Sequence, residues 1–135
     1  MVTLISTQPA AGSAVTFSGI PNSYQDLILN ITGVSHDNPA TAQVRVEISA
    51  DGAAWSPPVM IQQGAAALAY TSRITFAHYT DDIGAANRVQ PGGTPPSFAA
   101  SLAHHGWHCP GGIQALRVSL SAGNFDAGSF SLSGR

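Results

Sequence analysis

Strict alternation of apolar and polar residues in two short segments is the feature that most limits the folds open to this chain. Residues 43–49 read QVRVEIS and residues 115–120 read ALRVSL. A period of two with one polar or charged face is typical of a strand half-buried in an antiparallel sheet. We therefore expect the apolar residues of both segments to point into a core: Val44, Val46, Ile48, Leu116, Val118 and Leu120.

Further strand-like segments, separated by turn-forming residues such as Asp51-Gly52, bring the expected number of strands to about eight or nine. An alanine-rich stretch, residues 64–72, is a candidate for a short helix, but the β-branched and aromatic residues that follow it favour a strand. Residues 81–96 are polar, contain Gly and Pro, and are expected to form an extended loop. The sequence thus predicts one all-β domain over residues 1–135, an antiparallel β-sandwich. Its other strands are expected at residues 2–6, 15–17, 26–32, 59–62, 68–79, 97–103 and 128–133.

Charge is scarce in this chain and bears on its partners. Charged residues make up 9% of the 135 positions, the net charge is -2, lysine is absent, and the five arginines are scattered. Because no basic face is available to neutralise phosphates, we expect no nucleic-acid partner. No stretch reaches the length of a membrane span, and nothing after Met1 is like a signal peptide, so we expect a soluble, mature chain without membrane insertion.

One stretch, AHHGWHCPGG, concentrates residues that could hold a metal ion. Adjacent histidines in a strand point to opposite faces, and no zinc-site spacing occurs elsewhere. We therefore expect a polar loop here, with Trp107 packed on the end of the sandwich and Cys109 buried before a turn, and no bound cofactor. A transition-metal site or a catalytic thiol remains the alternative. The candidate ligands are His104, His105, His108 and Cys109.

Acidic residues give little support for an enzyme. Asp81-Asp82 is the one adjacent acidic pair, and Glu47 is expected to be exposed on a strand without a second carboxylate beside it. We expect a solvated turn at Asp81-Asp82, with a calcium site as the alternative, since carboxylates and loop carbonyls are the usual calcium ligands. The sequence also lacks a nucleophile elbow. We expect no catalytic activity.

Three phrases resemble those of a known family. SGIPNSYQDLILNITGV at residues 18–34, VRVEISADGAAW at 44–55 and GSFSLSGR at 128–135 are similar to strand and hairpin phrases of a small domain of tailed-phage virion surface proteins. That domain is a jelly-roll-like β-sandwich found in head decoration, head fibre or spike, and tail fibre proteins. Ser133 stands where the family more often has an aromatic residue, and residues 56–112 are not covered.

The resemblance implies a non-enzymatic structural protein at the virion surface. Because the chain is short and has no shaft-like repeat, we expect a capsid decoration or head-fibre-type protein. Its expected partners are copies of itself, as a homo-oligomer and most simply a trimer, and the major capsid protein or another virion protein. The alternative is a tail-fibre, receptor-binding or carbohydrate-binding module that holds a host glycan on exposed aromatic side chains. The candidate aromatics are Trp55, Tyr70, Tyr79 and Trp107.

Overall fold

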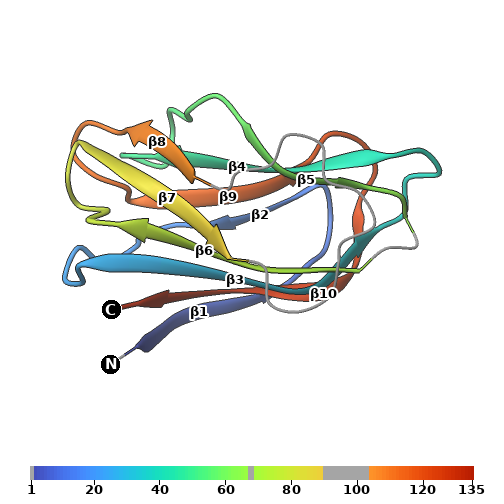
Figure 1. The fold of residues 1–135 in the computed structure, drawn as a ribbon, viewed down its shortest axis with the longest axis horizontal. Coiled ribbons are helices and arrows are strands. Elements are labelled where there is room, and N and C mark those ends of the chain that lie inside the picture. Colours follow the sequence, from blue (N-terminus) through green and yellow to red (C-terminus); the bar gives the residue numbers. More distant parts are fainter. Residues whose placement is uncertain (1, 67–68, 90–103) are drawn as a thin grey trace.

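In the computed structural model, which describes residues 2–66, 69–89 and 104–135, the chain forms two antiparallel β-sheets packed face to face (Figure 1). The described residues form ten strands, one or two more than expected, and no helix. The expected strand at residues 97–103 lies outside the described residues. The strands are β1 (Thr3–Pro9), β2 (Ala14–Phe17), β3 (Asp26–His36), β4 (Ala42–Ser49), β5 (Val59–Gly64), β6 (Tyr70–Ala77), β7 (Ile83–Val89), β8 (His104–His108), β9 (Ala115–Leu120) and β10 (Phe125–Gly134).

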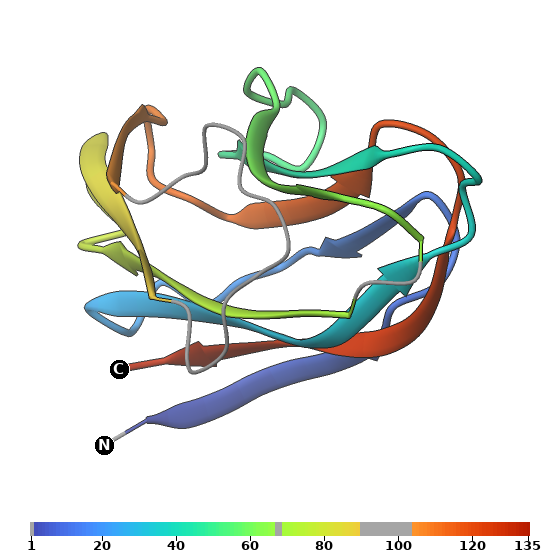
Figure 2. The ribbon, with the colours of Figure 1, turned by 45° about the vertical axis from the view of Figure 1, so that its right-hand side comes forward.

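The two sheets differ in size. The larger has the strand order β1-β10-β3-β6-β7-β8 and the smaller the order β2-β9-β4-β5. From β1 to β4, successive strands alternate between the sheets, so β1, β2 and β3 do not pair with the next strand in the sequence, whereas β4–β5, β6–β7 and β7–β8 are consecutive strands that pair. Figure 2 shows the sheets as two layers, and both termini lie at one end, where Thr3 pairs with Gly134. The predicted all-β sandwich is confirmed.

The core lies between the two layers and is built by the alternating strands. Val44, Val46 and Ile48 of β4 are each at most 6% exposed, and Leu116 and Val118 of β9 are fully buried. Fully burying an aliphatic side chain contributes about 1.5–3 kcal/mol, so these positions stabilise the sandwich strongly. The exception is Leu120, which is partly buried and packs against the edge of the core. The larger sheet contributes Leu27, Leu29, Ile31, Ile74, Phe76, Phe130 and Leu132.

The prediction of an extended loop over residues 81–96 is wrong for residues 83–89, and residues 90–96 lie outside the described residues. Residues 83–89 form β7, which pairs with β6 on one side and with β8 on the other. Residues 104–108, expected in a polar loop, form β8. Sequence reasoning missed both strands because IGAANRV and HHGWH lack an alternating apolar pattern. These strands extend the larger sheet beyond the smaller one and border the site described next.

Candidate functional site

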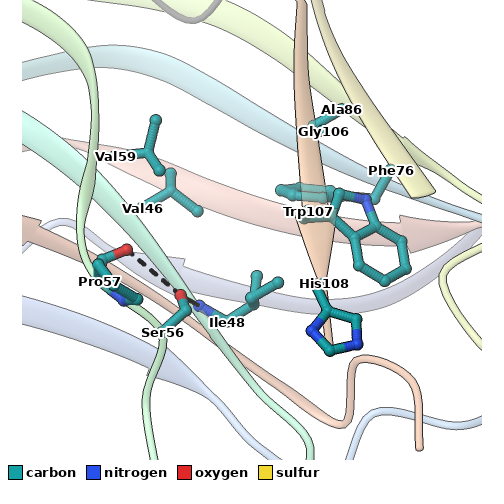
Figure 3. Close-up of a pocket in the computed structure, with 10 residues that line it drawn as sticks. All are labelled: Val46, Ile48, Ser56, Pro57, Val59, Phe76, Ala86, Gly106, Trp107 and His108. Carbon is teal, nitrogen blue, oxygen red and sulfur yellow. Dashed lines mark hydrogen bonds between the residues drawn. The ribbon is translucent and has the colours of Figure 1, made fainter. Parts of the chain in front are cut away.

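An apolar hollow of about 380 Å³ opens between the two sheets at one end of the sandwich (Figure 3). Figure 3 shows valine and isoleucine side chains of the smaller sheet on one side, and aromatic side chains of the larger sheet on the other. A volume in this range and a mostly apolar lining are typical of ligand pockets. We call this the inner hollow. Its lining is Val46, Ile48, Ser56, Pro57, Val59, Phe76, Ala86, Gly106, Trp107 and His108.

A second hollow, of about 240 Å³, adjoins the first on the outside. It lies between the loop that joins β4 to β5 and the turn that joins β8 to β9. Ile48, Ser56 and His108 line both hollows, so the two are contiguous. We call this the outer hollow. Its lining is Ile48, Ser49, Ala50, Asp51, Ala54, Trp55, Ser56, His108, Cys109 and Pro110.

The loop between β4 and β5 is held by Asp51, whose side chain folds back on the turn. Asp51 Oδ1 accepts hydrogen bonds from the backbone N–H of Ala53 (2.8 Å) and Ala54 (2.9 Å) and from Ser49 Oγ (3.1 Å). Asp51 Oδ2 accepts none among the residues that the structure describes. The backbone N–H groups of Ala54 and Ala53, followed by the Ser49 hydroxyl, hold the pKa of Asp51 below its usual range. The outer hollow therefore has a fixed, ionised carboxylate on one wall.

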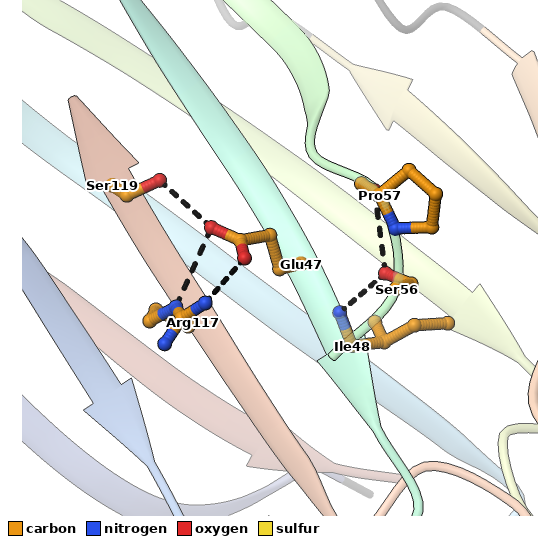
Figure 4. Close-up of polar contacts among 6 residues, drawn as sticks. All are labelled: Glu47, Ile48, Ser56, Pro57, Arg117 and Ser119. Atoms are coloured by element: carbon orange, nitrogen blue, oxygen red, sulfur yellow. Dashed lines mark hydrogen bonds and ion pairs between the residues drawn. The ribbon is translucent and has the colours of Figure 1, made fainter. Parts of the chain in front are cut away.

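The end of the same loop is tied to β4 by Ser56. The Ser56 N–H donates to Ile48 O (2.9 Å), and the Ile48 N–H donates to Ser56 Oγ (3.0 Å). Figures 3 and 4 show this hydroxyl between Ile48 and Pro57. The reciprocal pair fixes the shared wall of the two hollows, because both backbone groups of Ile48 that face the loop are satisfied.

The opposite wall is the turn after β8, which Asp82 stabilises. The Cys109 N–H donates to Asp82 O (2.7 Å), and the Gly111 N–H donates to Asp82 Oδ1 (2.9 Å). Cys109 itself is buried, and its Sγ donates to Gly112 O (3.3 Å). Burial, followed by the negative charges of Asp51 and Asp82, raises the pKa of the Cys109 thiol. A thiol in this state is a poor nucleophile.

Trp55 lines the outer hollow and packs on Arg117, whose ion pair with Glu47 on the smaller sheet is shown in Figure 4. The Arg117 guanidinium lies 4.3 Å from the centre of the Trp55 ring, and Arg117 pairs with Glu47 on the neighbouring strand. Ser119 Oγ donates to Glu47 Oε1 (3.0 Å). Contrary to expectation, the Glu47 side chain is only 12% exposed, because Arg117 covers it. Glu47 is thus a structural carboxylate that positions Arg117 under the indole.

The other three candidate aromatics do not present a face to solvent. Tyr70 is 4% exposed, Tyr79 is fully buried, and Trp107 is 8% exposed. The Tyr79 hydroxyl donates to Pro21 O and accepts from the Tyr24 N–H (3.3 Å), which makes it a structural group. The prediction that these three residues present exposed faces to a sugar was therefore wrong. Tyr70 lies at an inward-facing position of β6, and Trp107 at an inward-facing position of β8.

The histidine-rich stretch is divided between two environments. His108 is exposed at the junction of the two hollows, whereas Cys109 is buried in the turn beside it. His104 and His105 lie in β8, but their side chains are outside what the structure describes. Among the side chains that the structure describes, which do not include those of His104 and His105, no group of three or more from His, Cys, Asp or Glu is arranged to hold a metal ion. Asp81 and Asp82 lie in an exposed turn, where Asp82 Oδ1 accepts the Gly111 N–H.

Sequence reasoning named Trp55 as a binding residue but missed the two polar groups beside it. Asp51 was expected only to form a turn, and His108 was expected in a polar loop, with a role as a metal ligand as the alternative. Both line the outer hollow, and neither position follows from local pattern, since Asp51 lies in the β4–β5 loop and His108 at the end of β8. The described residues also contain no helix that could cross a membrane. Comparison with known protein families, curated proteins and solved structures finds no match to this chain.

Proposed function

We propose that this chain is a non-enzymatic structural protein of the surface of a tailed-phage virion, a capsid decoration or head-fibre-type protein that assembles as a homo-oligomer. The first support is the strand order. With the β7–β8 pair set aside, β1-β10-β3-β6 faces β2-β9-β4-β5. We interpret this interleaving as a jelly roll, the architecture of many viral capsid domains. The β7–β8 pair extends one edge of it.

The observation that carries the proposal is the low charge of the outer face of the larger sheet, where Asp26, the one carboxylate of β3, is paired with Arg135. Residues that pair across β1, β10, β3 and β6 and point away from the core form two rows with one charged member, Arg73, whose Nε donates to Asn30 Oδ1 (3.1 Å). Desolvating charged side chains is costly, so such a face suits close packing between subunits. The rows are Leu4–Ser133–Ile28–Thr75, of which Ser133 and Ile28 are buried in the chain itself, and Thr7–Ser131–Asn30–Arg73, which is exposed or half-buried throughout.

The edge of this face also favours association. β1 is the outermost strand, and Val2 and Leu4 are 53% and 62% exposed there. Edge strands that must stay unpaired are usually protected by charged side chains or by a β-bulge. β1 has no charged side chain, and its one protective feature of this kind is the register shift between Leu4 and Ser6. A second copy of the chain, or the shell protein on which the oligomer sits, would cover these apolar side chains.

The non-enzymatic part of the proposal is supported by the use of the charged groups that the structure describes. Glu47 is paired with Arg117, and Asp26 is paired with Arg135. Asp51 and Asp82 each accept backbone N–H groups in turns. These carboxylates stabilise the sandwich and its loops, and none of them is placed opposite a second one as acid–base chemistry on a glycosidic bond requires.

The test is assembly on the particle. Light scattering of the isolated chain should give the mass of an oligomer, with three copies expected, and the oligomer should rebind stripped particles in a fixed ratio to the major shell protein, since linked copies gain avidity. Thr32→Lys places a charge on the exposed outer face of β3 and should weaken assembly. Ala14→Lys, on the outer face of β2, is the matched control and should assemble normally. A monomeric wild-type chain that does not rebind would overturn the proposal.

A further inference from the structure

We propose that the outer hollow is a saccharide-binding site in which Trp55 stacks on one face of a sugar ring while Asp51 and His108 bond its hydroxyl groups. The proposal goes beyond a structural role on a particle and does not depend on it. It rests on three side chains of different chemistry that the β4–β5 loop and the end of β8 bring to one hollow. A sugar ring has the matching chemistry, with an apolar C–H face and a rim of hydroxyl groups.

The carboxylate of Asp51 is prepared for a ligand by the loop that holds it. Oδ1 is occupied by Ala53, Ala54 and Ser49, so the side chain cannot rotate without losing three hydrogen bonds. Oδ2 is left with full acceptor capacity among the described residues. A hydrogen bond from a hydroxyl group to an ionised carboxylate is stronger than one to a neutral acceptor. Because the carboxylate is already fixed, ligand binding does not carry the entropy cost of ordering this side chain.

The indole of Trp55 is likewise held in place before a ligand arrives. The Arg117 guanidinium lies 4.3 Å from the ring centre. Arg117 is held by its ion pair with Glu47, and Glu47 accepts a hydrogen bond from the Ser119 hydroxyl. The side chain is half-buried and lines the hollow, so part of its surface remains open to solvent. A rigid aromatic side chain that is partly wet is a suitable platform for an amphipathic ligand.

The exposed imidazole of His108 completes the site, since its ring nitrogens can donate to or accept from hydroxyl groups. The hollow, at about 240 Å³, is smaller than the roughly 300–1,000 Å³ of pockets that enclose drug-sized ligands. It therefore suits one ring at the end of a longer glycan. His108 also lines the apolar inner hollow, so an aryl group on the sugar would reach apolar surface. Aryl glycosides are for this reason the probes of choice.

The experiment titrates the full chain with p-nitrophenyl glycosides of the common hexoses and N-acetylhexosamines, followed by two-dimensional NMR. At least one glycoside should shift the resonances of Trp55 and of residues 49–56. Trp55→Ala and His108→Ala should each weaken binding by about tenfold. Trp55→Phe, which keeps an aromatic face, should retain part of the affinity, and thermal unfolding of each variant will show whether it is folded.

A matched control separates the site from general effects of removing a loop carboxylate. Asp51→Asn alters the acceptor in the hollow, whereas Asp37→Asn alters a similar exposed carboxylate that accepts a backbone N–H from Asn124 (2.8 Å) in another loop. The first variant should bind weakly and the second like the wild type. The proposal is wrong if no glycoside shifts these resonances, or if binding survives both Trp55→Ala and His108→Ala. Oligomeric mass and particle binding should be unchanged in Trp55→Ala and His108→Ala. A failure of the saccharide proposal can therefore be distinguished from a failure of the particle proposal.

Discussion

The indole of Trp107 lies directly on the backbone of Gly84, its partner in the pairing of β7 with β8. A Cβ at position 84 would come within 2.4 Å of Trp107 Cζ2, closer than any side chain tolerates. The absence of a side chain on one strand thus makes room for the largest side chain on the next. This fit closes the end of the core beside the inner hollow.

Gly84→Ala should therefore displace the indole and destabilise the fold by about 1–3 kcal/mol, the usual cost of overpacking. Gly106→Ala is the matched control, because a Cβ at position 106 would meet nothing nearer than Gly84 O at 3.9 Å. Urea denaturation followed by tryptophan fluorescence measures both. Equal midpoints for the two variants would show that the contact with Gly84 does not hold Trp107.

Val46, in the middle of β4, tests the core. It is 4% exposed, and Val46→Asp would bury a carboxylate with no partner, so we expect a loss of about 3–5 kcal/mol or failure to fold. Thr16→Asp puts the same residue on the exposed face of β2, opposite Arg117, and should change stability by less than about 0.5 kcal/mol. Circular dichroism during thermal unfolding compares the two. A Val46→Asp variant as stable as Thr16→Asp would place β4 outside the core.

Low pH should weaken the fold through Asp26. Burial alone would raise the pKa of Asp26, but Arg135 Nη2 at 2.9 Å and the His78 N–H at 3.1 Å outweigh burial and hold the pKa below its ordinary value of 3.8. The ionised form therefore stabilises the folded state above that value, and this contribution is lost as the pH falls through the lower, folded-state pKa.

The measurement is the urea midpoint as a function of pH for the wild type and for Asp26→Asn. The variant should be less stable at neutral pH, and its stability should fall less steeply than that of the wild type as the pH drops below about 5. Parallel curves for the two proteins would mean that Asp26 has the same pKa in the folded and unfolded chain.

Cys109 should be inert while the chain is folded. Cys109 is 6% exposed, and burial, followed by the negative charges of Asp51 and Asp82, raises the pKa of its thiol and keeps it protonated. A thiol reagent such as dithionitrobenzoate should react at a rate set by unfolding, and at once in concentrated urea. Cys109→Ser should fold, with a loss of about 1–2 kcal/mol for burying a hydroxyl. Rapid labelling of the native protein would instead identify an exposed, reactive thiol.

How far the sequence predicts this structure depends on how local each signal is. β4 and β9 were predicted from their alternation alone, because a period of two directly records which residues face the core. β7 and β8 were missed because their place in the sheet depends on the fit of Gly84 to Trp107, which joins positions in two different strands. The pattern of apolar and polar residues within either strand does not show which residue of the other strand it pairs with.

The candidate site shows the same division. Trp55 was predicted as a candidate binding residue from its type, and its binding role stays a prediction. The residues around Trp55 depend on where the β4–β5 loop meets the end of β8 in space. Asp51 has the sequence signature of a turn, and it does form one through Oδ1. That Asp51 lines one hollow with Trp55 and His108 follows only from the fold, which brings the β4–β5 loop against the end of β8.

The central claim, a structural protein of the virion surface, is tested most directly on intact particles. Phage particles produced from the genome that encodes this chain should be purified, their proteins quantified by mass spectrometry, and the chain located by gold-labelled antibody in electron micrographs. The account predicts a fixed number of copies relative to the major shell protein, a multiple set by the symmetry of the shell, with labels on the outer surface. Purified particles that lack the chain, or carry it in a ratio that varies between preparations, would contradict the account.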